Sequence, residues 1–244
     1  MSSDQSPLYQ GDLLGPKGPA GDRRGVGRVG STLGLLADSW RRRPVPRRIL
    51  TGLSILMLIG GVVLFAWPFL TNLYTDFRQV RLEDQFTSPA SRRAYITRTI
   101  EPGEALTRIR IPDLGVDTIV VEGTTLSALQ AGAGHYEESA LPCERGNAAI
   151  AGHRTTYGKP FASIDDLDPG DHITLETPVG RCTYRVTSEP FITTPTDFGV
   201  LEPGNGSILT LTTCHPPGSA EQRLIVQAKL ISSKVYESPR ESGA

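Results

Sequence analysis

Cysteine and histidine, the usual ligands of metal centres, are scarce in this sequence. Its 244 residues include three cysteines and four histidines, and no Cys-x-x-Cys occurs. The cysteines therefore lack the spacing of a metal site. Four aspartates gather between residues 165 and 171, but carboxylates around a Pro-Gly turn are more often turn residues than calcium ligands. We therefore expect no metal and no cofactor.

The whole chain has almost no net charge, but its two parts carry net charges of opposite sign. The formal net charge is −1, yet residues 1–48 hold nine Lys or Arg and four Asp, which gives +5 and leaves −6 for the remainder. The first 38 residues, rich in Gly, Pro and Ser, are predicted to be disordered. The basic cluster at 40–48 is by itself compatible with a solvated face or with nucleic-acid binding. The residues that follow favour a membrane, and we expect no nucleic-acid partner.

A long apolar run follows the basic cluster. Ile49–Tyr74 contains no charged residue, and Ile49–Leu70 is almost wholly apolar. About 20 such residues cross a bilayer as a helix. The run is too long for a signal-peptide core and lacks a clear small-residue cleavage site. We predict a single membrane helix at 49–72, with a cytoplasmic N-terminus and with arginines that contact anionic lipid. The alternative is a buried helix of a soluble domain.

The rest of the chain is then extracytoplasmic. We divide it into a linker at 73–103, a folded domain at 104–234 and a polar tail at 235–244. No long amphipathic helix pattern interrupts the folded domain; short strand patterns recur instead, with a helical turn and a short helix. The strands are expected at Leu106–Ile111, Asp117–Glu122, Asn147–Gly152, His172–Thr177, Arg181–Thr187, Phe191–Thr193, Ser207–Thr213 and Arg223–Ser232, and the helical segments at Leu126–Ala131 and Phe161–Leu167. This pattern predicts an all-β barrel or sandwich.

The last two strands bring together residues that suggest chemistry. Two prolines and a glycine separate them, so an antiparallel pair would place Cys214 beside Arg223. A neighbouring cation favours the thiolate, and a guanidinium can stabilise an oxyanion. His215 is a poor partner, because successive strand residues face opposite sides. His153, which follows another short strand, is the better candidate for a catalytic histidine.

These motifs resemble a known family. Thr210-Leu-Thr-Thr-Cys214, with Arg223 nine residues later and Ala151-Gly-His153-Arg before it, is similar to the sortase signature. Ala-Gly-His-Arg-Thr-Thr-Tyr-Gly together with Thr-Leu-Thr-Thr-Cys-His-Pro is most similar to class E sortases of actinobacteria. The resemblance covers about residues 104–233. It implies a closed β-barrel of seven or eight strands.

The resemblance also implies residue roles. Cys214 would be the nucleophile, His153 the general acid and base, and Arg223 the group that holds the substrate carbonyl or oxyanion. Each residue taken alone also has a structural interpretation. Cys214 could be a buried core cysteine, His153 a hydrogen-bonded histidine and Arg223 a surface cation. The implied reaction is transpeptidation. A secreted protein is cleaved between Thr and Gly of a C-terminal sorting signal, Leu-Ala-x-Thr-Gly in preference to Leu-Pro-x-Thr-Gly, and passed to a peptidoglycan precursor or other cell-envelope amine.

Further residues are assigned by position. Tyr136 and His135 lie where related sortases carry a pocket-lining segment, and an ordinary loop aromatic is the alternative for Tyr136. Thr212 and Thr213 are candidates for the substrate groove, although one of them must face the core. The pairing of Cys143 with Cys182 stays open: an oxidising compartment permits a disulfide, but the class E resemblance does not require one.

Three other functions compete with this interpretation. An L,D-transpeptidase would share the anchor and the thiol, but its Ser-His-Gly-Cys motif does not occur. A membrane-tethered barrel that only binds cell-wall peptides would not need Cys214, His153 and Arg223 together. A pilin-polymerising sortase commonly has a second C-terminal anchor, which we do not expect because residues 231–244 are short and polar.

Overall fold

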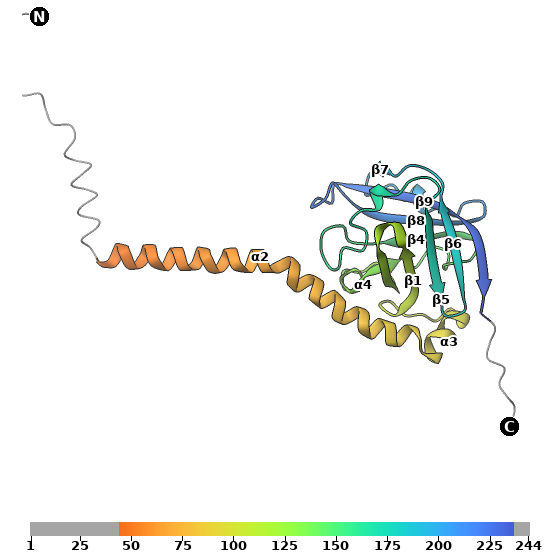
Figure 1. The fold of residues 1–244 in the computed structure, drawn as a ribbon, viewed down its shortest axis with the longest axis horizontal. Helices are drawn as coiled ribbons and strands as arrows, with labels where there is room; N and C mark the ends of the chain where they lie inside the picture. The colour runs from red at the N-terminus through yellow and green to blue at the C-terminus, as the bar shows by residue number, and fades with distance from the viewer. Residues whose placement is uncertain (1–43, 237–244) are drawn as a thin grey trace, which may run out of the picture. The chain divides into compact units, whose positions relative to one another are not determined.

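The computed structural model describes residues 44–236. The predicted disordered segment, residues 40–43 of the basic cluster and the end of the polar tail lie outside them. Helix α2, Pro44–Phe86, opens the described chain. The described residues fall into two units that meet within α2, between Ile59 and Gly60. The first unit is helical only, and the second contains the rest of α2 and every strand (Figure 1).

Helix α2 has the length and composition of a membrane span. The candidate span runs from Arg47 to Phe86, its apolar part has a mean hydropathy of 2.5, and none of that part is buried. It is the only such helix between residues 44 and 236. A core helix of a soluble domain would bury its large side chains, whereas Leu64 and Phe65 are 76% and 75% exposed. The exposure therefore favours the membrane interpretation over the soluble alternative.

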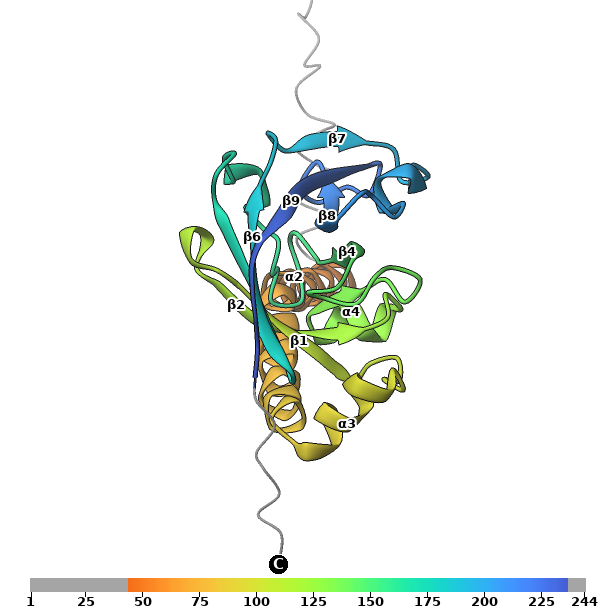
Figure 2. The same ribbon diagram turned by 90° about the vertical axis from the view of Figure 1, so that its right-hand side faces the viewer.

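The last four turns of α2 pack against the strands (Figure 2). Thr71, Thr75 and Leu82 are buried at helical spacing. The Gln79 amide donates to the carbonyls of Ile119 and Ala131 and accepts from the Ile119 N–H. The predicted linker at 73–103 is therefore largely helical and docked. Its second helix, α3, spans Pro89–Thr97 and is capped by Ser88.

Eight strands close into a barrel. They pair in the order β6-β5-β1-β2-β3-β4-β8-β9, and a β6–β9 pairing completes the circle; β7 adds to the start of β9. The strands are β1 Ala105–Ile111, β2 Val116–Glu122, β3 Ala133–His135, β4 Gly146–Ala151, β5 His172–Thr177, β6 Gly180–Val186, β7 Phe191–Thr193, β8 Ser207–His215 and β9 Gln222–Val235. The expected closed barrel is confirmed, and closure leaves its eight strands without a free edge.

The short elements differ in part from expectation. Helix α4, Leu126–Ala131, is where the sequence predicted a helical turn, and the Thr125 hydroxyl caps it. The helix predicted at Phe161–Leu167 is wrong: only a 3₁₀ turn, η2 Ile164–Asp166, forms there. Phe161, Ile164 and Leu167 all enter the barrel core from this irregular segment. Strand β3 was not predicted, because Ala133-Gly-His135 contains no β-branched or large apolar residue.

A disulfide joins the loop before β4 to the barrel wall. The Sγ atoms of Cys143 and Cys182 are bonded, and 39 residues separate the two cysteines in sequence. Cys182 lies on β6 and is buried in the core. The loop at Cys143 is also held by the Tyr184 hydroxyl, which accepts the Cys143 N–H. The bond thus restrains the segment that leads into the strand before His153.

Loss of this disulfide should lower stability. Closing a loop of this length contributes roughly 3–4 kcal/mol in the chain-entropy estimate. The midpoint of thermal unfolding of Cys143→Ser is therefore expected to fall by about 10 °C. The measurement compares wild type and variant with and without a reductant. Reductant should lower the wild-type midpoint to that of the variant; equal midpoints without reductant would contradict the prediction.

Candidate active site

Three strands end side by side at the candidate site. Strands β4 and β8 run parallel, with Ala151 beside Thr212, and the Gly152 N–H extends the pairing by donating to the Thr212 carbonyl. Two residues beyond the pair of Ala151 and Thr212, the chain reaches His153 after the end of β4 and Cys214 on β8. On the other side of β8, Cys214 is the antiparallel partner of Arg223 on β9. The expected pairing of Cys214 with Arg223 is confirmed, and the register places His153, Cys214 and Arg223 in a row.

The alternation along β8 decides which side chains share the face of Cys214. Leu209 and Leu211 point into the barrel core. Thr212 and Cys214 therefore lie on the outer face. Thr213 lies on the core side, is 3% exposed, and donates its hydroxyl to the Gly152 carbonyl. Thr213 is thus a correction to the expected groove residues: it fastens β8 to the end of β4.

His153 is partly buried and weakly held. Burial lowers the pKa of its imidazole. Its Nε2 is buried without a hydrogen-bond partner among the described residues. The Tyr157 ring lies against it, with the ring centroids 5.3 Å apart. Cys214 beside it is a free thiol of intermediate exposure. The site therefore favours a neutral imidazole without a carboxylate on Nε2.

Arg223 keeps most of its donors free. Its Nη1 donates to the carbonyls of Ala220 and Gln222, each at 3.0 Å. Its Nε and Nη2 make no hydrogen bond, and it forms no ion pair, within the part of the chain that the structure describes. Two hydrogen bonds on one nitrogen fix the guanidinium while leaving a fork of N–H groups for a ligand oxygen.

A groove adjoins Arg223 on the outer face. A small cavity is lined by Tyr136, Thr212, Arg223 and Ile225, together with residues of β7 and of η3, Phe198–Leu201. A larger cavity of about 510 Å³ continues past Tyr136 toward Phe198. The Tyr136 hydroxyl lies 3.3 Å from the Thr212 Oγ1. Tyr136 and Thr212 are therefore positioned to contact a peptide that lies across β8.

His135 is also a correction. It is fully buried, so its ring does not line the groove. Its Nδ1 lies 3.1 Å from a carboxylate oxygen of Glu122, and its Nε2 lies 2.9 Å from the Ala140 carbonyl. The Ser139 hydroxyl contacts the same Nε2 and donates to the Tyr136 carbonyl. His135 therefore supports the backbone on which Tyr136 stands instead of contacting a ligand.

Sequence reasoning missed the role of Arg154. Its side chain is 4% exposed and pairs with Asp165 at 2.6 Å. Its Nη1 donates to His215 Nδ1 at 3.0 Å and approaches the Cys214 carbonyl at 3.5 Å. Arg154, the residue directly after His153, thus connects this segment to the end of the strand that carries Cys214. The available signal was its place in the motif, directly after the histidine.

Loss of Arg154 should reduce activity without removing a reacting group. Arg154→Met deletes charge-assisted hydrogen bonds, and we expect a loss of about 2 kcal/mol in the free energy of unfolding. We also expect kcat to fall about tenfold with little change in KM, because misplacement of a catalytic group costs rate. Asp165→Asn keeps an oxygen acceptor for Arg154 and should have a smaller effect. A change in KM alone would contradict this positioning role.

The burial of His153 has a consequence for stability. Because its pKa is lowered in the folded chain, the unfolded chain binds a proton more readily near pH 6, and stability rises with pH up to about the unperturbed pKa of 6.5. His153→Gln removes this dependence. The free energy of unfolding, measured by chemical denaturation, is compared between variant and wild type at each pH. The variant's value minus the wild-type value should be more positive at pH 5 than at pH 8. A difference independent of pH would contradict the prediction.

The acidic patch has structural partners. Asp165 pairs with Arg154, and the Asp171 carboxylate accepts the Asp168 N–H in the turn before β5. Between residues 44 and 236 there is no group of three or more His, Cys, Asp or Glu side chains placed to hold a metal ion. Asp165 therefore serves as an ion-pair residue and Asp171 as a turn residue.

Comparison with known proteins gives a consistent result. The family model described as "Sortase domain" matches residues 109–231. Sortase SrtE1 of Streptomyces coelicolor is 36% identical over 160 residues, which cover 59% of this chain and 44% of that protein. Sortase D of Bacillus subtilis is 30% identical over 54% of this chain and 67% of its own length. The chain thus spans less than half of the first relative and about two thirds of the second.

Solved structures agree with the sequence matches. A sortase D5 transpeptidase of Clostridium perfringens matches with a TM-score of 0.57 and 33% identity, over 65% of this chain and 99% of its own. Sortase E1 of Streptomyces coelicolor, solved with a tripeptide in the active site, matches with a TM-score of 0.53 and 34% identity, over 56% and 93%. The sequence identities of both matches, 33% and 34%, are high enough to indicate a shared family as well as a shared fold.

Proposed function

The chain belongs to the sortase family of cysteine transpeptidases, and on this premise we propose that it joins secreted proteins to an amine of the cell envelope. The observation that carries the proposal is the row of His153, Cys214 and Arg223 at three adjacent strand ends. Nucleophile, proton carrier and oxyanion donor are the three groups that thioester chemistry needs.

The first half-reaction forms a thioacyl enzyme. The Cys214 thiolate attacks the carbonyl carbon of the Thr residue in the sorting signal, and a C–Sγ bond forms. The free N–H groups of Arg223 stabilise the oxyanion. The C–N bond to Gly then breaks, and protonated His153 gives its proton to the leaving nitrogen. The C-terminal fragment departs as an amine, and His153 is left neutral.

The second half-reaction reverses these transfers. A neutral acceptor amine attacks the thioester carbon, the new C–N bond forms and the C–Sγ bond breaks. The electron pair of that bond returns to Sγ, and the amine proton passes to His153. The cycle therefore restores the thiolate–imidazolium pair without a further reactant. The lowered pKa of His153 favours release of this proton to the leaving nitrogen in the first half-reaction of the next cycle.

The groove next to Arg223 is the proposed binding site for the sorting signal. Tyr136 and Thr212 line it beside Arg223. A tripeptide occupies the active site of the Streptomyces coelicolor sortase E1 structure, which supports a short peptide as ligand here. We propose Leu-Ala-x-Thr-Gly as the preferred signal, with the Tyr136 side chain contacting the residue before x.

The membrane helix sets the proposed location. Residues 49–72 would span the bilayer with the arginine-rich N-terminus in the cytoplasm, since basic flanks stay on that side. The catalytic domain at 104–234 would then lie outside, where its disulfide is stable and where secreted proteins and envelope amines meet. Lipid headgroups would contact the basic flank.

The test uses the full chain in detergent micelles. The chain is incubated with a Leu-Ala-x-Thr-Gly or a Leu-Pro-x-Thr-Gly peptide and a small amine, and products are identified by mass spectrometry. Expected are cleavage after Thr, capture by the amine and a transient acyl adduct that maps to Cys214, with faster reaction of the Ala peptide. Absence of both cleavage and adduct would overturn the proposal and favour a binding barrel.

A further inference from the structure

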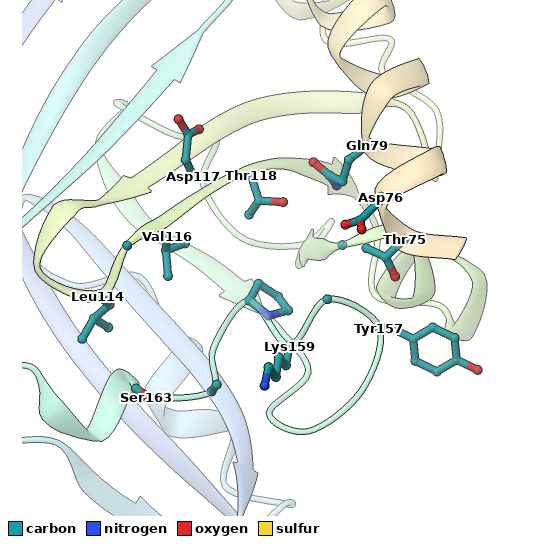
Figure 3. A pocket seen from close by; sticks show the side chains of 15 residues that line it. Thr75, Asp76, Gln79, Leu114, Val116, Asp117, Thr118, Tyr157, Lys159 and Ser163 are labelled. Carbon is teal, nitrogen blue, oxygen red and sulfur yellow. The ribbon is translucent and has the colours of Figure 1, made fainter. Parts of the chain in front are cut away.

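A third cavity adjoins the loop that follows His153. Its volume is about 390 Å³, a size that suits a small ligand. Helix α2, the chain at 114–118, Gly132 and the loop at 157–163 that follows His153 all contribute to its lining (Figure 3). It shares no lining residue with either cavity of the groove. It is therefore a separate site.

The walls of this cavity are held in place. Gln79 binds the backbone of β2, and the Thr75 hydroxyl donates to the Gln130 carbonyl. The Asn72 side-chain oxygen accepts the Gly158 N–H at 3.0 Å. A Cβ on Gly158 would lie 3.0 Å from Thr75, and the φ of Gly158 is +70°. Glycine is thus suited to this close approach, and the cavity exists before any ligand arrives.

The charged groups of the cavity are suited to a ligand that carries both a positive and a negative charge. Asp76 lies on the helix wall and Lys159 on the loop wall (Figure 3). Neither side chain forms an ion pair among the described residues. The third charged group, Asp117, is already paired with Arg108 and Arg110. The cavity therefore offers one free carboxylate and one free ammonium, both on exposed side chains, to a ligand that carries both charges.

The cavity also has a defined place along the chain. Asp76 is the first charged residue after the charge-free stretch that begins at Ile49. The cavity thus lies where α2 would leave the bilayer. Tyr157 lines the cavity and its ring lies against His153. A molecule bound here would approach His153 past Tyr157, whereas a peptide in the groove would lie beside Arg223.

We propose that this cavity binds the amine acceptor, and that the acceptor is a short peptide that carries a carboxylate besides its amine. The inference rests on the proposed function. Lys159 binds the acceptor carboxylate, and Asp76 attracts the ammonium form of its amine. The ammonium loses one proton to solvent, and the neutral amine attacks the thioester as described above. Donor and acceptor then occupy separate cavities.

The experiment measures acceptor use by the full chain in detergent micelles. The donor is a saturating Leu-Ala-x-Thr-Gly peptide, and the acceptors are triglycine and triglycinamide, which differ by one carboxylate. Ligated product is quantified by mass spectrometry, and donor cleavage is followed separately with hydroxylamine. The variants are Lys159→Gln and Asp76→Asn. Their controls, Lys229→Gln and Asp84→Asn, change exposed charges outside the cavity.

Lys159→Gln should raise the KM for triglycine about fivefold, the upper end for an exposed ion pair, and leave triglycinamide unchanged. Asp76→Asn should raise the KM for both acceptors, and neither control should change either. All variants should cleave the donor at the wild-type rate with hydroxylamine. An unchanged triglycine KM in Lys159→Gln, or slower donor cleavage, would overturn the cavity assignment. If wild type cleaves no donor, the proposed function fails first and the assignment with it.

Discussion

Cys214→Ala and Cys214→Ser are both expected to lower donor cleavage about 10⁴-fold or more, as the loss of a nucleophile does in other covalent enzymes. Alanine removes the attacking atom. Serine keeps an attacking atom but needs a base strong enough to take its proton during attack. The comparison of the two variants therefore tests how the nucleophile is activated as well as which atom it is.

The environment of His153 explains why serine should fail. Its pKa is lowered by burial, and its Nε2 has no hydrogen-bond partner in residues 44–236. A serine protease instead relies on a histidine whose other nitrogen is bound to a carboxylate. Initial rates and adduct formation are measured by mass spectrometry, with folding checked by thermal unfolding. More than about 1% of wild-type activity in Cys214→Ser would contradict a thiolate mechanism.

The barrel was predictable because its strands carry strong local signals. Ser207–Thr213 alternates residues on two faces, and the Pro-Gly turn after it fixes an antiparallel return. These features alone gave the pairing of Cys214 with Arg223, which the register confirms. The position of His153 relative to Cys214 needed the family resemblance, because parallel pairing of β4 with β8 joins segments about 60 residues apart and leaves no local pattern.

The errors occurred where tertiary contacts override local pattern. Phe161, Ile164 and Leu167 have helical spacing, yet they reach the core from an irregular segment with one 3₁₀ turn. His135 looks like a loop residue because Ala133-Gly-His135 has no β-branched or large apolar residue, but pairing with β2 and β4 buries it. Burial between two neighbouring strands cannot be predicted from a segment without a strand-forming residue.

The docked part of α2 was hidden by its composition. A linker that mixes charged and apolar residues fits a flexible stalk as well as a helix. In the structure, Thr71, Thr75, Gln79 and Leu82 form a stripe of mostly polar residues against the barrel. A hydrophobic stripe would have predicted this face, whereas a stripe held by side-chain hydrogen bonds to backbone carbonyls of β2 and α4 gives no such pattern. Sequence alone therefore missed the cavity beside it.

Arg223→Ala is expected to lower kcat about 10²–10³-fold, the usual cost of removing an oxyanion donor. The reason is that Arg223 has no ion pair of its own in the described chain, so its N–H groups meet their partner only when charge develops on the substrate oxygen. Such an interaction lowers the barrier more than it strengthens ground-state binding. KM for the donor peptide should therefore change much less than kcat.

Arg223→Lys separates charge from geometry. Lysine keeps the positive charge but replaces the planar fork by one ammonium, so we expect an intermediate loss of about tenfold in kcat. Arg185→Lys, an exposed arginine on β6, is the matched control and should leave kcat unchanged. The measurement is steady-state kinetics with the preferred peptide, which gives kcat and KM for each variant. If Arg223→Ala raised KM and left kcat intact, Arg223 would be a binding residue for the sorting signal and the oxyanion would need another donor.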